Sequence, residues 1–255
     1  MDLSEFRDRL NGRLDHDAYA DADPSANGLQ VGRADARTLE NVAFAVDGVA
    51  ATAAAAATAD ADLLVVHHGL VWGGLDRVTG QAYERLATFV EHDLPLYVSH
   101  LPLDGHPELG NAARLADFLG CEPTEPFGEV GGVTVGQRAR AAEPYTVAGL
   151  RDRLSALDTG GKPVDVLDFG SEEVSEVAIV TGAGTDWLGP AAAAGVDALV
   201  TGEGKGKTYH EAREAGVNVF LAGHYATETF GVRALESLAA DWGLETMFLE
   251  HPTGL

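Results

Sequence analysis

The apolar and polar positions of this chain follow two patterns. Short apolar runs rich in β-branched residues, each bounded by glycine or polar residues, are typical of buried strands. Longer segments with apolar residues at helical spacing separate these runs. The runs predict strands at residues 41–46, 63–66, 96–98, 177–181, 198–201 and 217–221, with a last apolar segment at 245–249. The longer segments predict helices at residues 2–13, 50–59, 83–91, 110–119, 146–157, 189–195 and 228–240.

This alternation of strands and helices predicts an α/β fold with mainly parallel sheets and right-handed crossovers. Residues 122–140 interrupt the alternation with several prolines and glycines, so we place a domain junction there. The chain is then expected to form two α/β lobes. The first lobe comprises residues 1–122 and is completed by the C-terminal segment 220–255, and the second comprises residues 123–219.

Three histidine motifs directly follow predicted strands. They are His67-His68, His100 with Asp104 four residues later, and His224 with Glu228 four residues later. Ligands of parallel sheets bind outside the carboxyl ends of the strands, and parallel strands share that edge. Motifs that are far apart in the sequence can therefore converge there. Imidazoles beside carboxylates form a mixed nitrogen and oxygen donor set, which suits zinc, iron or manganese.

Each motif also has a purely structural interpretation. Adjacent histidines in the middle of a strand point to opposite faces, but a bend at Gly69 would bring both inward. Pro102 argues against a regular helix between His100 and Asp104, which favours a tight loop. An ordinary Asp-Gly turn at Asp104-Gly105 would explain the same residues without any ligand.

The four-residue spacing of His224 and Glu228 puts both side chains on one face at the start of a helix. The alternative is that Thr227 caps the helix and Glu228 only interacts with the helix dipole. A buried carboxylate is costly unless it is paired or metal-bound. No lysine and few arginines lie near these motifs in the sequence. The three motifs together therefore favour a metal site over three separate structural explanations.

The charge balance of the chain is strongly acidic. Its 255 residues contain 40 acidic and 17 basic residues, a formal net charge of −23, and only three lysines. The acidic residues are scattered, which is typical of a halophilic protein in a salt-loaded cytoplasm, where screening removes self-repulsion. The same charge argues against direct nucleic-acid binding, because contact with phosphates needs a basic surface.

The remaining composition indicates a cytoplasmic globular protein. Its 45% hydrophobic content is ordinary for that class. Cys121 is the single cysteine, so no internal disulfide can form, and this fits a reducing compartment. The N-terminal residues do not read as a signal peptide, and no apolar run reaches membrane-spanning length, so we expect no membrane association.

The motifs resemble the three signatures of one known family, the GTP cyclohydrolase I type 2 homologues, also called the Nif-three-like family. They read His67-His68-Gly69, Ser99-His100-Leu101-Pro102-Leu103-Asp104 and Gly223-His224-Tyr225-Ala226-Thr227-Glu228. Asn27-Gly28-Leu29-Gln30-Val31-Gly32, Gly110-Asn111, Leu119-Gly120 and Thr201-Gly202-Glu203 with His210 beyond are similar to further family segments. Glu203 stands where the family usually has aspartate, and Leu101 where it often has threonine. The likeness covers nearly the whole chain, which matches the short members without an inserted domain.

The resemblance implies two related α/β lobes with a dinuclear metal centre in the cleft between them. The implied ligands are His67, His68, Asp104, His224 and Glu228, which would bind two divalent ions of zinc, iron or manganese. His100 would lie at the edge of the site, as a second-layer or substrate-facing group and a candidate catalytic residue. The resemblance also implies a homohexamer, built as a ring-like trimer of dimers.

Hydrolysis is the reaction expected of such a centre, because paired metal ions activate water and polarise a carbonyl or phosphoryl oxygen. The substrate would be a small molecule, phosphorylated or purine-like. Candidates for a proton donor are His100, His210 and Glu203. The loop 181–186 could hold a phosphate on its N–H groups, although a tight turn explains it better. The alternative function is a metal-binding or protein-interaction factor without turnover.

Overall fold

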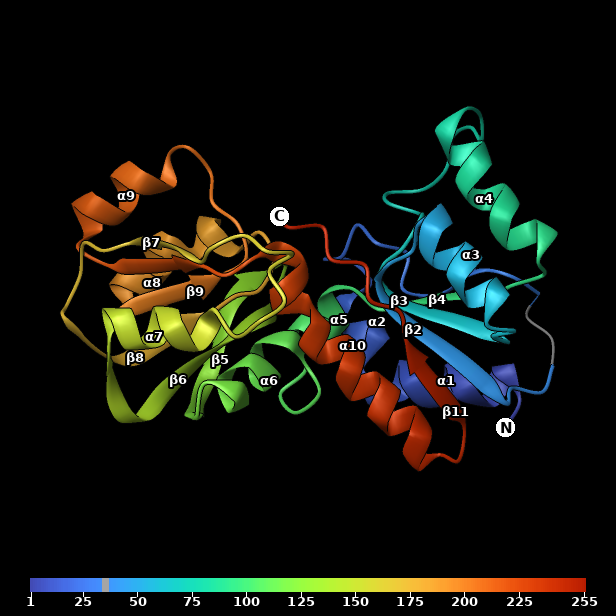
Figure 1. Cartoon of the computed structure of the whole chain (residues 1–255), viewed down its shortest axis with the longest axis horizontal. Helices are drawn as coiled ribbons and strands as arrows, with labels where there is room; N and C mark the ends of the chain where they lie inside the picture. Colours follow the sequence, from blue (N-terminus) through green and yellow to red (C-terminus); the bar gives the residue numbers. More distant parts are fainter. Residues whose placement is uncertain (34–36) are drawn as a thin grey trace. The chain divides into compact units, whose positions relative to one another are not determined.

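The computed structural model describes residues 1–33 and 37–255 (Figure 1). These residues form two compact units. Unit 1 comprises residues 1–103 and 232–251, and unit 2 comprises residues 104–231 and 252–255. The sequence-based division near residue 122 therefore differs from the division at residues 103 and 104. Each unit has one sheet with helices packed against it, so the fold is a mixed α/β fold with two sheets. None of the described helices is long and apolar enough to cross a membrane.

The sheet of unit 1 has the strand order β1-β4-β3-β2-β11. The strands are β1 (Gly28–Val31), β2 (Asn41–Asp47), β3 (Leu63–His68), β4 (Leu96–Val98) and β11 (Glu245–Phe248). All neighbours pair in parallel except β1, which runs antiparallel to β4 at one edge. The prediction of a mainly parallel sheet is confirmed for this unit. Strands β2, β3 and β4 consequently end at the same edge.

Helices cover both faces of this sheet (Figure 1). They are α1 (Leu3–Arg13), α2 (His16–Tyr19), α3 (Ala50–Thr58), α4 (Gln81–Glu91) and the second half of α10 (His224–Asp241). Alternate residues of the strands face opposite sides, as the two-residue period of a strand requires. Leu64 and Val66 join a core cluster with Ala53 of α3 and Phe89 of α4. On α1, Phe6 makes edge contacts with the rings of Tyr97 and Trp242.

The sheet of unit 2 has the strand order β5-β6-β8-β9-β10-β7. The strands are β5 (Cys121–Val130), β6 (Val133–Thr146), β7 (Asp165–Leu167), β8 (Glu173–Ile179), β9 (Ala198–Thr201) and β10 (Asn218–Leu221). Only β8, β9 and β10 are mutually parallel, and the other pairings are antiparallel. The expectation of a mainly parallel sheet is therefore wrong for this unit, whose sheet is mixed.

The segment 122–140, which we expected to be a domain junction, is instead part of the hairpin of β5 and β6. Gly131 and Gly132 form its turn with φ angles of 56° and 91°, which side chains disfavour. Pro123 and Pro126 are tolerated because β5 is an edge strand, where one side of the backbone needs no sheet partner. The prolines and glycines that suggest a linker therefore mark an edge strand and a turn.

Besides the start of α10, four further α-helices lie wholly in unit 2, and a fifth, α5, has only its last two residues there. They are α5 (Leu101–Gly105), α6 (Asn111–Phe118), α7 (Val147–Leu154), α8 (Leu188–Ala193) and α9 (Thr208–Ala215). Leu115 of α6 and Leu150 of α7 pack against Val177, Val200 and Phe220 of the parallel strands in one buried cluster. This core fixes the carboxyl ends of β8, β9 and β10, and His224 and Glu228 follow the end of β10.

Candidate metal centre

Four polar side chains of unit 1 lie at or just after the carboxyl ends of three parallel strands. Asp47 ends β2, His67 and His68 end β3, and His100 follows β4 after one residue. Strand β3 continues through His68, so the prediction that it stops at Val66 is two residues short. The imidazole rings of His67 and His68 nevertheless lie with centroids only 4.6 Å apart. The two rings therefore lie close together, although neighbouring residues of a strand point to opposite faces.

Hydrogen bonds fix the orientation of both rings. The Nδ1 atom of His67 lies 2.9 Å from the backbone carbonyl oxygen of Ser99. The Nδ1 atom of His68 lies 2.9 Å from a carboxylate oxygen of Asp47. A carbonyl oxygen can only accept, so Nδ1 of His67 must donate its proton. An ionised carboxylate likewise only accepts, so Nδ1 of His68 donates as well. A ring that carries one proton then has its lone pair on Nε2.

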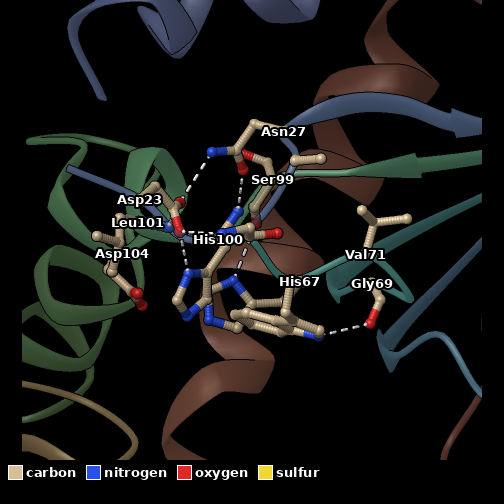
Figure 2. Close-up of polar contacts among 12 residues, drawn as sticks. Asp23, Asn27, His67, Gly69, Val71, Ser99, His100, Leu101 and Asp104 are labelled. Carbon is tan, nitrogen blue, oxygen red and sulfur yellow. Dashed lines mark hydrogen bonds and ion pairs between the residues drawn. The ribbon is translucent and has the colours of Figure 1, made fainter. Parts of the chain in front are cut away.

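The third imidazole, His100, is held by a buried carboxylate (Figure 2). Its Nδ1 atom donates to Oδ1 of Asp23 at 2.8 Å, and its backbone N–H donates to Asn27 at 2.7 Å. Asp23 also accepts from the N–H groups of Ser25 and Leu101 and from the amide of Asn27. Burial raises the pKa of Asp23, but the bonds from His100, Asn27 and Ser25 outweigh it and leave that pKa below its ordinary value.

This arrangement fits metal binding. The three imidazoles could each offer one ligand atom, and these atoms lie within 4.8 Å of one another. Metal-binding histidines almost always donate their other ring N–H to a carboxylate or carbonyl, which fixes the tautomer. His67, His68 and His100 all show this pattern. Trp72 completes the surroundings, because its ring lies 4.9 Å from that of His100 and its Nε1 donates to the carbonyl of Gly69.

Asp104 lies in unit 2, on the short helix α5. The prediction of a loop at this position is wrong, since residues 101–105 form one helical turn. Pro102 is tolerated because the N–H groups of a first turn have no partner within the helix. Asn111 and Thr181 donate to Oδ1 of Asp104 at 2.8 and 3.2 Å, and Asn111 accepts from the N–H of Gly231 at 2.7 Å. Asp104 is therefore a buried carboxylate in a defined position.

His224 and Glu228 lie on the first turns of α10, as the spacing predicts for one face of a helix. The helix begins at His224, so Thr227 is inside it and does not cap its start. Nε2 of His224 lies 3.2 Å from the carboxylate of Glu228, and its Nδ1 lies 3.3 Å from that of Glu203. Burial lowers the pKa of His224, but these two carboxylates outweigh it and raise the pKa to about 9.

A glycine lies directly against this pair. A Cβ atom on Gly182 would be 2.2 Å from Oε1 of Glu228, and its φ of 59° also favours glycine. The N–H groups of Gly182 and Gly184 donate to Thr227 and Thr201, so neither is available to a phosphate. These contacts support the interpretation of the loop 181–186 as a tight turn.

The predicted ligands are thus divided between the units. His67 and His68 lie in unit 1 with His100, whereas Asp104, His224 and Glu228 lie in unit 2. Of the candidate proton donors, Glu203 contacts His224, and His210 is an exposed residue of α9.

Sequence reasoning missed the supporting residues. Asp23 and Asp47 orient His100 and His68, and Asn111 holds Asp104. Asp47 could have been recognised, because it ends a predicted strand just as the histidine motifs do. Asp23 gave a weaker signal. It lies four residues before Asn27, in a polar stretch without regular periodicity.

The fold and these polar clusters define a mixed α/β protein with candidate metal ligands at strand ends. The family model of Duf34/NIF3 (NGG1p interacting factor 3) matches residues 1–254. A protein of Halobacterium salinarum named GTP cyclohydrolase 1 type 2 homolog is 59% identical, and one of Archaeoglobus fulgidus with the same name is 41% identical; both matches cover 100% of each chain.

Solved structures are also similar to this chain. TTHA1606 from Thermus thermophilus, a crystal structure, is 40% identical with a TM-score of 0.89. The solved structure of protein ybgI, described as of unknown function, is 34% identical with a TM-score of 0.90. Both comparisons cover 100% of each chain. The chain therefore belongs to the Duf34/NIF3 family, and the resemblance inferred from its motifs is confirmed.

Proposed function

We propose that this protein binds two divalent metal ions and uses them to hydrolyse a small molecule. The proposed ligands are His67 and His68 from unit 1 and Asp104, His224 and Glu228 from unit 2. The observation that supports this proposal best is the shared orientation of the imidazoles in unit 1. Each donates Nδ1–H to a carbonyl or carboxylate oxygen, which leaves Nε2 as the donor atom for a metal.

The acidic set of unit 2 supports the same proposal. Asp104 and Glu228 are buried, with 7% and 3% of their surfaces exposed. A buried carboxylate is costly unless a cation or several donors compensate its charge. A divalent cation would compensate both, and the mixed set of nitrogen and oxygen donors suits zinc, iron or manganese.

When bound, such ions polarise a carbonyl or phosphoryl oxygen and make water a better nucleophile, so hydrolysis is the reaction class we propose. His100 supplies the proton chemistry in this proposal. Its Nδ1–H is held by the ionised Asp23, so its Nε2 can accept a proton and later return it. The name of the relatives, GTP cyclohydrolase 1 type 2 homolog, makes purine nucleotides one substrate class to test.

The second candidate function is metal binding or protein interaction without turnover. The description of the family as an interacting factor favours it. His100 would then be a further metal ligand and not a base, which its closeness to His67 and His68 also allows.

One experiment separates these functions. Purified protein in high KCl is analysed for bound metals, loaded with zinc, iron or manganese, and assayed on a panel of phosphoesters, cyclic amides and purine nucleotides. We expect turnover that chelation abolishes and metal restores. His100→Ala should keep both ions and lose about 10²–10⁴-fold in rate, while the exposed His92→Ala should match the wild type.

The other outcomes assign the alternatives. Loss of metal together with activity in His100→Ala would make His100 a ligand. A metal-loaded protein that turns over nothing on the panel would favour the interaction factor.

We also propose a homohexamer, which the family resemblance supports. Light scattering should give a mass of about six times 26.6 kDa. A monomer at both low and high salt would contradict it.

A further inference from the structure

A cavity of about 520 Å³ lies in unit 1 between the end of β1, the segment after β3 and the first half of α4. Val31 and Leu70, which also pack against the core of the unit, contribute to its lining. The cavity is within the size range of small-molecule sites, which are mostly apolar with a few placed polar groups.

The lining from α4 comes from one face of the helix. Gln81, Ala82, Arg85 and Leu86 are spaced as neighbours on a helix surface, and all four line the cavity. Only Phe89 of this helix is buried. The helix is therefore anchored near its C-terminal end, and its first half extends over the cavity and not over a packed core.

The opposite wall is held by a fixed side chain. The amide oxygen of Gln30 accepts from the N–H groups of Leu70 and Val71 at 2.8 and 3.1 Å, and its nitrogen donates to the carbonyl of Ala26 at 2.7 Å. The N–H groups of Leu70 and Val71 are thereby satisfied within the protein. Both residues line the cavity.

The charge of the lining is opposite to that of the chain. Among the described residues that line the cavity, Arg85 is the one charged residue and none is acidic, in a chain with 40 acidic and 17 basic residues. Within the described residues, Arg85 has no carboxylate partner, whereas most arginines of the chain do. A cationic group beside apolar walls matches a ligand with an anionic group on an apolar body.

Exposed large apolar side chains also occur in residues 70–90, the segment that supplies most of the lining. Among the described residues, six large apolar side chains are exposed, and four of them are Trp72, Leu75, Tyr83 and Val90. Leu75 lines the cavity. Clusters of exposed apolar residues are typical of binding surfaces.

We propose that this cavity binds a small anionic amphiphile, a molecule with an aromatic or aliphatic body and one carboxylate, phosphate or sulfonate group. The body contacts the apolar walls, and the anionic group pairs with Arg85. The same short segment that contributes Leu70 and Val71 to the cavity also contributes Trp72 to the imidazole cluster. The site is separate from the proposed metal ligands, and the proposal does not depend on metal binding.

The test uses two probes of equal shape and different charge, 2-naphthoate and its neutral analogue 2-naphthamide. Both are titrated into the whole protein with labelled leucine and valine methyl groups, at one fixed KCl concentration. We expect the methyl signals of Val31, Leu70 and Leu86 to shift saturably with both probes. Naphthoate should bind about fivefold more tightly, since it alone can pair with Arg85.

Three variants decide the assignment. Arg85→Gln should remove the preference for naphthoate and keep naphthamide binding. Ala82→Trp, at an exposed helix position, should fill the cavity and abolish binding of both probes. Arg77→Gln is the matched control, because Arg77 belongs to the same segment but does not line the cavity.

Several results would overturn the proposal. These are the absence of saturable shifts in the wild type, shifts that spread over both units, and a naphthoate preference that survives Arg85→Gln. Methyl shifts that depend on protein concentration without any probe would show that a second copy of the chain covers the cavity instead.

Discussion

The candidate ligands of the two units are placed in similar ways but differ in charge. In unit 1 they follow the carboxyl ends of the parallel strands β3 and β4. In unit 2 His224 and Glu228 follow the end of β10, whereas Asp104 lies on α5, the helix after β4. In unit 1 the candidate ligands are imidazoles, and the carboxylates of Asp23 and Asp47 lie behind them as acceptors. In unit 2 carboxylates are themselves candidate ligands, and His224 lies between Glu203 and Glu228.

This difference determines whether a cation must displace a proton when it binds to the candidate ligands of each unit. The imidazoles of unit 1 each direct Nδ1 at an acceptor oxygen, which orients Nε2 as the atom that can bind a metal. Glu228 and Glu203 raise the pKa of His224 to about 9, so it is protonated at neutral pH. A cation that binds His224 must displace that proton. The imidazoles of unit 1 are therefore oriented for metal binding in advance, whereas in unit 2 His224 forms ion pairs with Glu203 and Glu228.

The largest effect should come from removing one ligand of each set. His68→Ala and Glu228→Ala should both lower the metal content from about two ions per chain, because each deletes a donor atom. Elemental analysis after dialysis measures this, with the exposed His92→Ala and Glu214→Ala as controls. Unchanged stoichiometry in both variants would contradict the ligand assignment. A loss in only one variant would show that a single unit binds the metal.

The next effect concerns the carboxylates behind the imidazoles. Asp23 accepts four N–H groups, and an asparagine offers only one oxygen for them. Asp23→Asn should therefore loosen His100 and change its tautomer, which the ¹⁵N shifts of its ring report directly. If His100 is a ligand, metal affinity should also fall about 10–100-fold.

The matched control is Asp62→Asn, since Asp62 also accepts backbone N–H groups in unit 1 but lies outside the imidazole cluster. Equal effects of both variants on the ¹⁵N shifts of His100 would mean that Asp23 only supports the fold. Such a result would remove the distinction between the two units.

The sequence allowed the strands and the ligand motifs to be predicted because their signals are local. The strands at residues 96–98 and 198–201 are found at the predicted positions, since an apolar run between polar residues identifies a buried strand. The hairpin of β5 and β6 could not be predicted, because its edge position makes its prolines harmless, and that position depends on distant strands. The helical turn at α5 was missed because the rule against proline does not apply to a first turn.

The candidate site was predictable only in part. The histidine and carboxylate motifs can be recognised because they follow predicted strands and, in two of them, the carboxylate lies four residues after the histidine. Their partners do not, because Asp23 meets His100 across 77 residues and Asn111 meets Gly231 across 120 residues. Such contacts result from the tertiary fold, and they cannot be inferred from local patterns in a single sequence.

Salt should affect both units together. The net charge of −23 repels itself where screening is weak, and the Debye length falls from about 10 Å at 0.1 M salt to about 2 Å at 2 M. We expect the melting temperature to climb steeply with KCl over this range, as measured by calorimetry. A flat dependence would refute the halophilic interpretation. Two transitions that respond differently would show that the charge destabilises the units unequally.

The smallest expected effect is a pH dependence that belongs to unit 1 alone. His16 is buried, its Nε2 lies 3.0 Å from the hydroxyl of Ser99, and its ring stacks on Tyr97. Burial lowers the pKa of His16 to about 4, against the opposing attraction of Asp23 and Asp17.

Between pH 6.5 and 4 the unfolded chain therefore binds a proton at His16 that the folded chain does not bind, so stability falls as the pH falls. From pH 7 to pH 5 this histidine should cost about 2 kcal/mol of unfolding free energy. Urea unfolding of the wild type and His16→Gln at both pH values measures this contribution. The variant should be less stable at pH 7, since it loses buried contacts, but it should lose less stability on acidification. Equal losses in both proteins would show that other groups cause the acid sensitivity of the chain.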